Sequence, residues 1–202
     1  RLDTETKSLC LTPIVPQVWL VQMVDAFNDR VQQQYQQIVL DVPAELPALI
    51  SDLSYLDRVF TELLTNACKY TPRGGTIRIT ARYQKEAETL VQNGSDTLNL
   101  KNSLETFDLS VPSNVCSPTL GSSPSANCFL LSISNTGAEI PLEELQHIFD
   151  RFYRVPNSDP WKHGGTGLGL ALVKKLVEAL GATIEVVSQN AETTFTLKFP
   201  VT

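Results

Sequence analysis

The chain has 202 residues, of which 42% are hydrophobic and 19% charged, a composition typical of a globular protein large enough to bury one sizeable core. Its net charge of −6 argues against a nucleic-acid-binding protein, which usually carries a basic face. Its apolar runs are too short to span a bilayer, no signal-peptide pattern opens the chain, and the start at Arg1 without Met suggests a piece excised from a longer protein.

The cysteines indicate the redox compartment. Cys10, Cys68, Cys116 and Cys128 lack the CxxC spacing of metal and redox pairs. We therefore expect free thiols in a reducing, cytoplasmic compartment. Cys116 and Cys128 flank a loop rich in Ser, Pro and Gly, so a bridge between these two remains an alternative.

Apolar periodicity predicts three main helices. The first is expected over 15–35, where apolar residues recur every three positions. Either Ser51 or Asp52 can cap the second helix, which runs to about Tyr70. The third follows a glycine-rich loop and stops before Gly181. The recurring residues of the first helix are Val18, Val21, Val24 and Phe27.

Strand patterns predict a sheet interrupted by an insertion. Apolar and polar residues alternate over 76–83, and a second strand is expected at 129–134. The residues between, 84–128, are too many for an ordinary loop and are interpreted as an insertion in a hairpin. The element order predicts one domain over 1–202, an α/β (α+β) two-layer sandwich with a mixed, mostly antiparallel sheet of about five strands and three main helices on one face. Further strands are expected at 38–42, 183–187 and 194–199, with an edge strand at 9–11.

Glycines alternate with other residues at Gly165, Gly167 and Gly169, directly before the third helix. Glycine permits positive φ and close approach of the backbone to a ligand. The following helix directs unpaired N–H groups and the positive end of its dipole at the same point. This pattern predicts an anion site, most simply for a phosphate, although a glycine-rich turn before a helix is often only a turn.

The second helix presents two faces. Glu62, Asn66 and Lys69 form a narrow polar stripe with Tyr70 at its edge. On an isolated helix such a stripe is simply solvated. Beside a phosphate site, Asn66 could ligate Mg²⁺, Glu62 could polarise a water or hydroxyl, and Lys69 could balance phosphate charge. The predicted core face contains Leu56, Phe60, Leu63, Leu64 and Ala67.

Four segments, in order, resemble motifs of sensor histidine kinases. Residues 62–72 resemble the N box, 148–154 the F box, 165–170 the G2 box and 193–200 the closing strand. The resemblance implies the catalytic, ATP-binding domain of a two-component histidine kinase, with the Bergerat fold shared with gyrase and Hsp90. It also implies ATP and Mg²⁺ as cofactors and an ATP lid over 137–169, in which we expect a short helix at 142–149.

The resemblance implies roles for individual residues. Glu62, Asn66 and Lys69 are the expected catalytic residues, and Asn66 matches the Mg²⁺ ligand. Lys69 and Tyr70 match residues that contact phosphates and frame the nucleotide. Phe149 and Phe152 match the aromatics that anchor the lid. The remaining expected nucleotide contacts are Arg154 for phosphate charge, Thr194 near the adenine, and the loop residues Gly165, Thr166, Gly167, Leu168 and Gly169.

The G1 box departs from the usual Asp-x-Gly-x-Gly. Asn135 replaces the Asp that accepts a hydrogen bond from the adenine amino group, and Glu139 replaces the second glycine, which removes a hinge. An amide oxygen can still accept this bond, at a loss of about 1 kcal/mol, or about tenfold in affinity at most. We therefore expect ATP to bind more weakly than usual. Gly137 and Ile140 of this box complete the expected nucleotide contacts.

The chain lacks a phosphoacceptor. Neither His147 nor His163 is followed by an acidic residue, so the nucleophile is expected from a separate helical dimerisation domain of the same parent chain. A response regulator is the second expected partner, and no nucleic-acid or membrane contact is expected. Two other functions remain open, a kinase-like interaction module that does not turn over ATP and a stand-alone ATPase of the same superfamily.

Overall fold

The computed structural model describes residues 8–85, 127–137, 139–156 and 165–201. The chain divides into two compact units, and all of the described residues belong to the first. The second unit, Glu86–Ser125, falls within the range 84–128 predicted as an insertion and lies outside the described residues.

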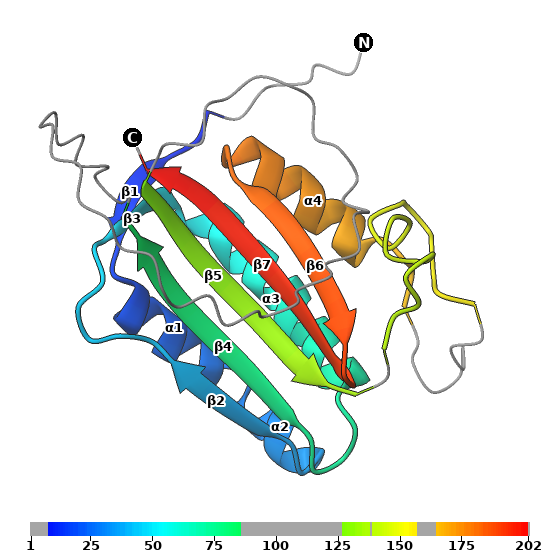
Figure 1. The fold of residues 1–202 in the computed structure, drawn as a ribbon. Coiled ribbons are helices and arrows are strands. Elements are labelled where there is room, and N and C mark those ends of the chain that lie inside the picture. Colours follow the sequence, from blue (N-terminus) through cyan, green and yellow to red (C-terminus); the bar gives the residue numbers. More distant parts are fainter. Residues whose placement is uncertain (1–7, 86–126, 138, 157–164, 202) are drawn as a thin grey trace, which may run out of the picture. The chain divides into compact units, whose positions relative to one another are not determined.

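A five-stranded sheet forms one layer, in the order β2-β4-β5-β7-β6 (Figure 1). β2 (Gln37–Asp41) pairs in parallel with β4 (Thr76–Gln84), and the other pairs are antiparallel. The predicted mixed, mostly antiparallel sheet is therefore confirmed. The other strands are β5 (Asn127–Thr136), β6 (Thr183–Gln189) and β7 (Glu192–Val201).

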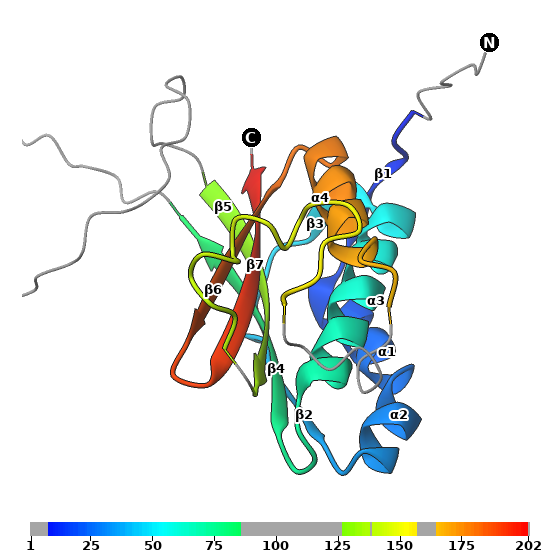
Figure 2. The ribbon, with the colours of Figure 1, turned by 90° about the vertical axis from the view of Figure 1, so that its right-hand side faces the viewer.

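The helices form the second layer on one face of the sheet (Figure 2). They are α1 (Pro16–Asp25), α2 (Asn28–Gln33), α3 (Leu53–Tyr70) and α4 (Gly169–Ala179). Alternate strand residues point toward them, and these apolar side chains form the core with the buried face of α3. The buried strand residues are Ile77, Ile79, Ala81, Phe129, Leu131, Ile133, Phe195, Leu197 and Phe199, and all five residues predicted for the core face of α3 are buried.

The single helix predicted over 15–35 is wrong, because the segment forms α1 and α2. The spacing of the valines was misleading, since Val18 and Val21 are 57% and 49% exposed. Trp19 determines the orientation of α1 instead. Its ring packs edge-on against Phe60 at 4.5 Å between centroids, and its Nε1–H donates to Asp57 Oδ1 at 2.6 Å. A large aromatic surface contributes more to burial than two valines.

A two-stranded antiparallel ribbon precedes α3. The edge strand predicted at 9–11 begins two residues later, as β1 (Leu11–Ile14), and its partner β3 (Leu49–Asp52) was not predicted. Asp52 at the end of β3 is the N-cap of α3, accepting hydrogen bonds from the backbone N–H groups of Ser54 and Tyr55. Asp52 Oδ2 also accepts from the Cys10 N–H at 2.8 Å, which ties the ribbon to the helix.

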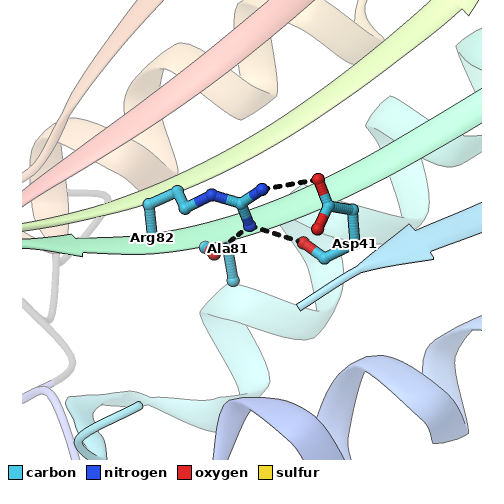
Figure 3. A network of polar contacts seen from close by, with 3 residues as sticks. All are labelled: Asp41, Ala81 and Arg82. Atoms are coloured by element: carbon cyan, nitrogen blue, oxygen red, sulfur yellow. Dashed lines mark hydrogen bonds and ion pairs between the residues drawn. The ribbon is translucent and has the colours of Figure 1, made fainter. Parts of the chain in front are cut away.

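The outer face of the sheet carries cross-strand ion pairs. Arg82 on β4 donates to the carboxylate and the backbone carbonyl of Asp41 on β2, and to the carbonyl of Ala81 (Figure 3). Lys198 on β7 lies 2.6 Å from Glu185 Oε1 on β6. These pairs join each edge strand to its neighbour on the exposed face.

The helix predicted over 142–149 is wrong. This segment is a series of turns, in which the Glu144 N–H bonds to the Pro141 carbonyl and the His147 N–H to the Glu144 carbonyl. One hydrogen bond of the α-helical type, between residues four apart, forms from the Ile148 N–H to the Glu144 carbonyl at 3.2 Å. One such bond does not offset the entropy of fixing a helical turn, so the helix does not propagate.

Candidate functional site

The polar stripe of α3 lies where the sequence predicts it. Glu62, Asn66 and Lys69 are half-buried along one side of the helix, and Tyr70 at its last turn is exposed. The Arg58 guanidinium, one turn earlier, contacts Glu62 Oε1 at 2.7 Å. Lys69 Nζ lies 4.8 Å from the centroid of the Tyr70 ring. Sequence reasoning missed Arg58, although its spacing of four residues from Glu62 is a recognised signal for an ion pair.

The glycine loop lies directly against this stripe, although the two segments are about a hundred residues apart. A Cβ on Gly165 would lie 3.0 Å from Lys69 Nζ, and one on Gly169 would lie 2.9 Å from Glu62 Oε2. The absence of side chains at these positions therefore allows the start of α4 to approach the two charged groups. This close approach brings the N box and the G2 box together in one candidate site. Thr166 and Leu168, also expected to contact nucleotide, are exposed in the loop.

Gly167 connects the same loop to the F box. It has φ +71°, and the Phe152 N–H donates to its carbonyl at 2.9 Å. The Phe152 ring is 72% exposed, so it does not anchor the lid as the resemblance implied. Phe149 does contact the core, with its ring edge-on to Phe195 on β7 at 6.4 Å. Arg154 is half-buried in the same segment.

The G1 box follows the end of β5. Asn135 is 7% exposed and lies between Ile77 of β4 and Thr193 of β7 in register. Its Nδ2 makes a long hydrogen bond of 3.4 Å to the Thr136 carbonyl. Gly137, two residues later, has φ +151°, and a Cβ there would lie 2.6 Å from the Tyr70 carbonyl. The start of the lid thus passes against the end of α3, beside the polar stripe.

The structure changes which threonine is expected near the adenine, a place given to Thr194 from the resemblance. Thr194 pairs with Ser134 and points to the outer face of the sheet, away from the stripe. Thr193 pairs with Asn135 on the helix-covered face and is 5% exposed. Thr193 is therefore the residue that lies beside the G1 box. The sequence carries the signal for it, because Thr193 alternates in step with the apolar residues Phe195 and Leu197.

Hydrogen bonds join the start of the lid to the β6–β7 hairpin. The Ile140 N–H donates to Ser188 Oγ at 2.8 Å, and Ser188 Oγ lies 2.7 Å from Thr193 Oγ1. The Gly137 N–H donates to the Ala191 carbonyl, while the Ala191 N–H donates to Glu139 Oε1 at 2.7 Å. The glutamate that replaces a glycine in the G1 box therefore adds a bond at the base of the lid.

Some sequence expectations concern other parts of the chain. His163 and the first glycine of the loop, Gly164, lie outside the described residues, as does Cys116. Cys10, Cys68 and Cys128 are free thiols. Over the described ranges, no three His, Cys, Asp or Glu side chains gather as a metal site, and no helix has the length and apolarity to cross a bilayer.

One face of the sheet is covered by helices, and the G1, F and G2 boxes meet beside α3. These features define a two-layer α/β sandwich of the Bergerat type. The chain belongs to the family of histidine kinase-, DNA gyrase B- and HSP90-like ATPases, whose model matches residues 51–202. This result confirms the resemblance to the catalytic ATP-binding domain of sensor histidine kinases, which was inferred from four short motifs.

Individual proteins resemble this chain in sequence or in fold. The chain is 28% identical over 198 residues to the adaptive-response sensory kinase SasA of Synechococcus elongatus, covering 96% of this chain and 40% of that protein. Full-length ShkA, solved in complex with AMPPNP, has a TM-score of 0.66 at 20% identity, covering 96% of this chain and 31% of that one. The histidine kinase ThkA, solved with its response regulator TrrA, has a TM-score of 0.62 at 17% identity, covering 95% and 42%. The chain thus spans less than half of each of these proteins.

Proposed function

We propose that this domain binds ATP with Mg²⁺ between the polar stripe of α3 and the loop 165–169, and that its parent protein transfers the γ-phosphoryl group to a histidine on a separate helical domain. The observation that carries the proposal is the close approach of Gly165 to Lys69 and of Gly169 to Glu62. A backbone loop that leads into a helix beside an ammonium group has the charge and shape that phosphates require.

The residues present fit a nucleotide at both ends. At the phosphate end, Cβ atoms on Gly165 and Gly169 would fill the space beside Lys69 and Glu62. At the base end, Asn135 is buried but has only a long hydrogen bond to its neighbour, which leaves polar atoms of its amide for a ligand. Tyr70, 43% exposed at the end of α3, would frame the nucleotide.

The side chains of α3 suggest a division of labour. Asn66 would hold Mg²⁺ through its amide oxygen, and the bound ion would neutralise charge on the phosphates. Lys69 would stabilise the charge on the phosphate oxygens. Glu62 would orient the incoming nucleophile or accept its proton, and Arg58 holds that carboxylate in place. Because the chemistry is mainly positioning and charge neutralisation, the domain would supply everything except the nucleophile.

The partners follow from this assignment. The helical dimerisation domain of the parent would carry the phosphoacceptor, since neither histidine of this chain has the expected context. A response regulator would receive the phosphoryl group next, and the complex of ThkA with TrrA supports a partner of this kind. ATP is available in the cytoplasm, and the free thiols of Cys10, Cys68 and Cys128 are compatible with that location.

Thermal unfolding with increasing ATP and Mg²⁺ tests the proposal. Binding must stabilise the folded state, by about 2.7 kcal/mol at a ligand concentration one hundred times the dissociation constant. We expect Asn66→Ala to remove most of the Mg²⁺-dependent part of this shift, and Asn28→Ala, on the exposed surface of α2, to retain it. A melting temperature unchanged at millimolar ATP would favour an interaction module instead. ATP turnover without a helical partner would favour a stand-alone ATPase.

A further inference from the structure

Three neighbouring polar side chains near the ends of β5, β6 and β7 share a property that a carboxylate lacks. Asn135, Ser188 and Thr193 can each donate and accept a hydrogen bond. Asn135 and Thr193 are both more than nine-tenths buried and lie opposite each other in register. Ser188 pairs with Thr193 in the neighbouring ladder, on the same face. Among the described residues, no charged side chain hydrogen-bonds to any of the three.

The hydroxyl pair can reverse its direction. Ser188 Oγ accepts the Ile140 N–H at 2.8 Å and lies 2.7 Å from Thr193 Oγ1, and either hydroxyl can be the donor. If Ser188 donates, the proton of Thr193 is available to a ligand. If Thr193 donates, its lone pair is available to a ligand. The bond from Ile140 is kept in both states, because an oxygen with two lone pairs can accept it either way.

Asn135 can reverse as well. Its amide presents an oxygen on one side and an NH₂ group on the other, and rotation about χ2 exchanges them. The bond that opposes this rotation is the 3.4 Å contact from Nδ2 to the Thr136 carbonyl, which is long for a hydrogen bond. An ionised carboxylate in this position would only accept hydrogen bonds and would have no such freedom.

From these groups we infer that the site binds 6-oxopurine nucleoside triphosphates, such as ITP, with an affinity close to that for ATP. This inference rests on the proposed function, in which the base lies against Asn135, and on the position of Thr193 opposite Asn135 in register. Adenine presents a donor at its 6-amino group and an acceptor at N1, whereas hypoxanthine presents an acceptor at O6 and a donor at N1. Donor and acceptor are therefore exchanged between the two bases at both positions. The Asn135 amide and the Thr193 hydroxyl can each exchange donor for acceptor to match them.

The size of the effect separates this site from one of fixed polarity. A site built to hydrogen-bond one pattern rejects the wrong pattern by several orders of magnitude, because a buried polar group is left unpaired. In a site whose groups can reverse, binding the other base costs only the free energy of reorienting an amide and two hydroxyls. We therefore expect the dissociation constants of ITP and ATP to differ by less than about tenfold.

Isothermal titration of the chain with ATP and with ITP, each with Mg²⁺, measures this ratio directly. In Asn135→Asp, measured at pH 8 so that the carboxyl is ionised, ITP should lose at least about tenfold in affinity relative to ATP. Asn190→Asp introduces the same chemical change on the exposed β6–β7 turn and should leave the ratio unchanged. A third variant, Thr193→Val, should weaken both nucleotides while keeping the ratio within a few-fold.

The outcomes separate the two proposals. If ATP stabilises and binds the chain but ITP binds more than about tenfold more weakly or not at all, the inference is wrong and the proposed function stands. If Asn135→Asp leaves the ratio as it is in the unmodified chain, the inference is also wrong. If neither nucleotide binds, the proposed function itself fails. The comparison in the unmodified chain is decisive even if Asn135→Asp does not fold.

Discussion

The carboxylate of Glu139 lies 2.7 Å from the backbone nitrogen of Ala191 and accepts its hydrogen bond, joining the start of the lid to the turn between β6 and β7. Ala191 and Asn190 both have positive φ, near +55°, the conformation that a tight hairpin turn demands and that non-glycine residues adopt at some energetic expense. Glu139 therefore supports a strained turn through this hydrogen bond.

The first prediction concerns this bond. Glu139→Gly removes the acceptor and restores a flexible residue, so amide hydrogen exchange at Ala191 should accelerate and the free energy of unfolding should fall by about 1 kcal/mol. Glu139→Gln keeps an acceptor oxygen and should change both quantities much less. Exchange measured by NMR checks this directly. Equal protection of Ala191 in the Glu139→Gly variant and the unmodified chain would show that the bond does not form in solution.

A second prediction tests the approach of the glycine loop to α3. Gly169→Ala places a Cβ 2.9 Å from Glu62 Oε2, so the carboxylate must move and ATP affinity should fall by about tenfold or more, as measured by titration. The fold should not weaken, because alanine favours a helix more than glycine does.

The matched control is Gly74→Ala, in the turn before β4. A Cβ there meets nothing within 4 Å, but the position has φ +79°, so this variant should lose stability and retain its nucleotide affinity. Gly169→Ala is thus expected to lose nucleotide affinity and keep stability, whereas Gly74→Ala is expected to lose stability and keep affinity. Loss of affinity in both would indicate that binding depends on general stability.

The third prediction concerns acid unfolding. Hydrogen bonds from the Ser54 hydroxyl and the Cys10 N–H hold the pKa of Asp52 below its ordinary value. A lowered folded-state pKa means that this stabilisation is complete above the ordinary aspartate pKa, roughly 4, and is lost as the pH falls through the folded-state value. In urea titrations, Asp52→Asn should lower the midpoint at pH 7 and flatten its decline below pH 4. An equally steep decline in the variant would assign acid sensitivity to other carboxylates.

The fourth prediction separates the cysteines. Burial raises the pKa of the Cys68 thiol, and the residue is fully enclosed in the core, so little thiolate forms and reagents have no access. Cys10 is exposed. Iodoacetamide at pH 8 should therefore modify Cys10 while Cys68 stays unmodified until the chain is unfolded, as mass spectrometry of peptides can show. Early modification of Cys68 would reveal opening of the core around α3.

The parts of the structure that sequence reasoning predicted are those governed by one dominant periodicity. Helix α3 has a strong apolar face, so the burial of Phe60 and the position of the polar stripe on another side of the helix could both be read from spacing. The sheet and its order of elements could be predicted in the same way. The positions of Glu62 and Lys69 beside the glycine loop depended on the motifs, because spacing alone does not bring distant segments together.

The parts that could not be predicted depend on tertiary contacts. The break between α1 and α2 has no proline or glycine signal, and the packing of Trp19 on Phe60 sets the orientation of α1. Strand β3 has four residues and exists because it pairs with β1. Thr193 and Thr194 are chemically identical, and although the alternation with Phe195 and Leu197 carries a signal, the pairing of β7 with β5 establishes which of them lies opposite Asn135.

The length of β5 has a practical consequence. The strand has ten residues from Asn127 to Thr136, roughly 30 Å from end to end, and Asn135 of the site lies near the end opposite to Asn127. The chain leaves the sheet after Gln84 and re-enters it at Asn127, at the end farthest from the glycine loop (Figure 1). A guest sequence such as a fluorophore or an affinity tag, joined at Gln84 and Asn127, would therefore be attached to the sheet at the end of β5 opposite to Asn135.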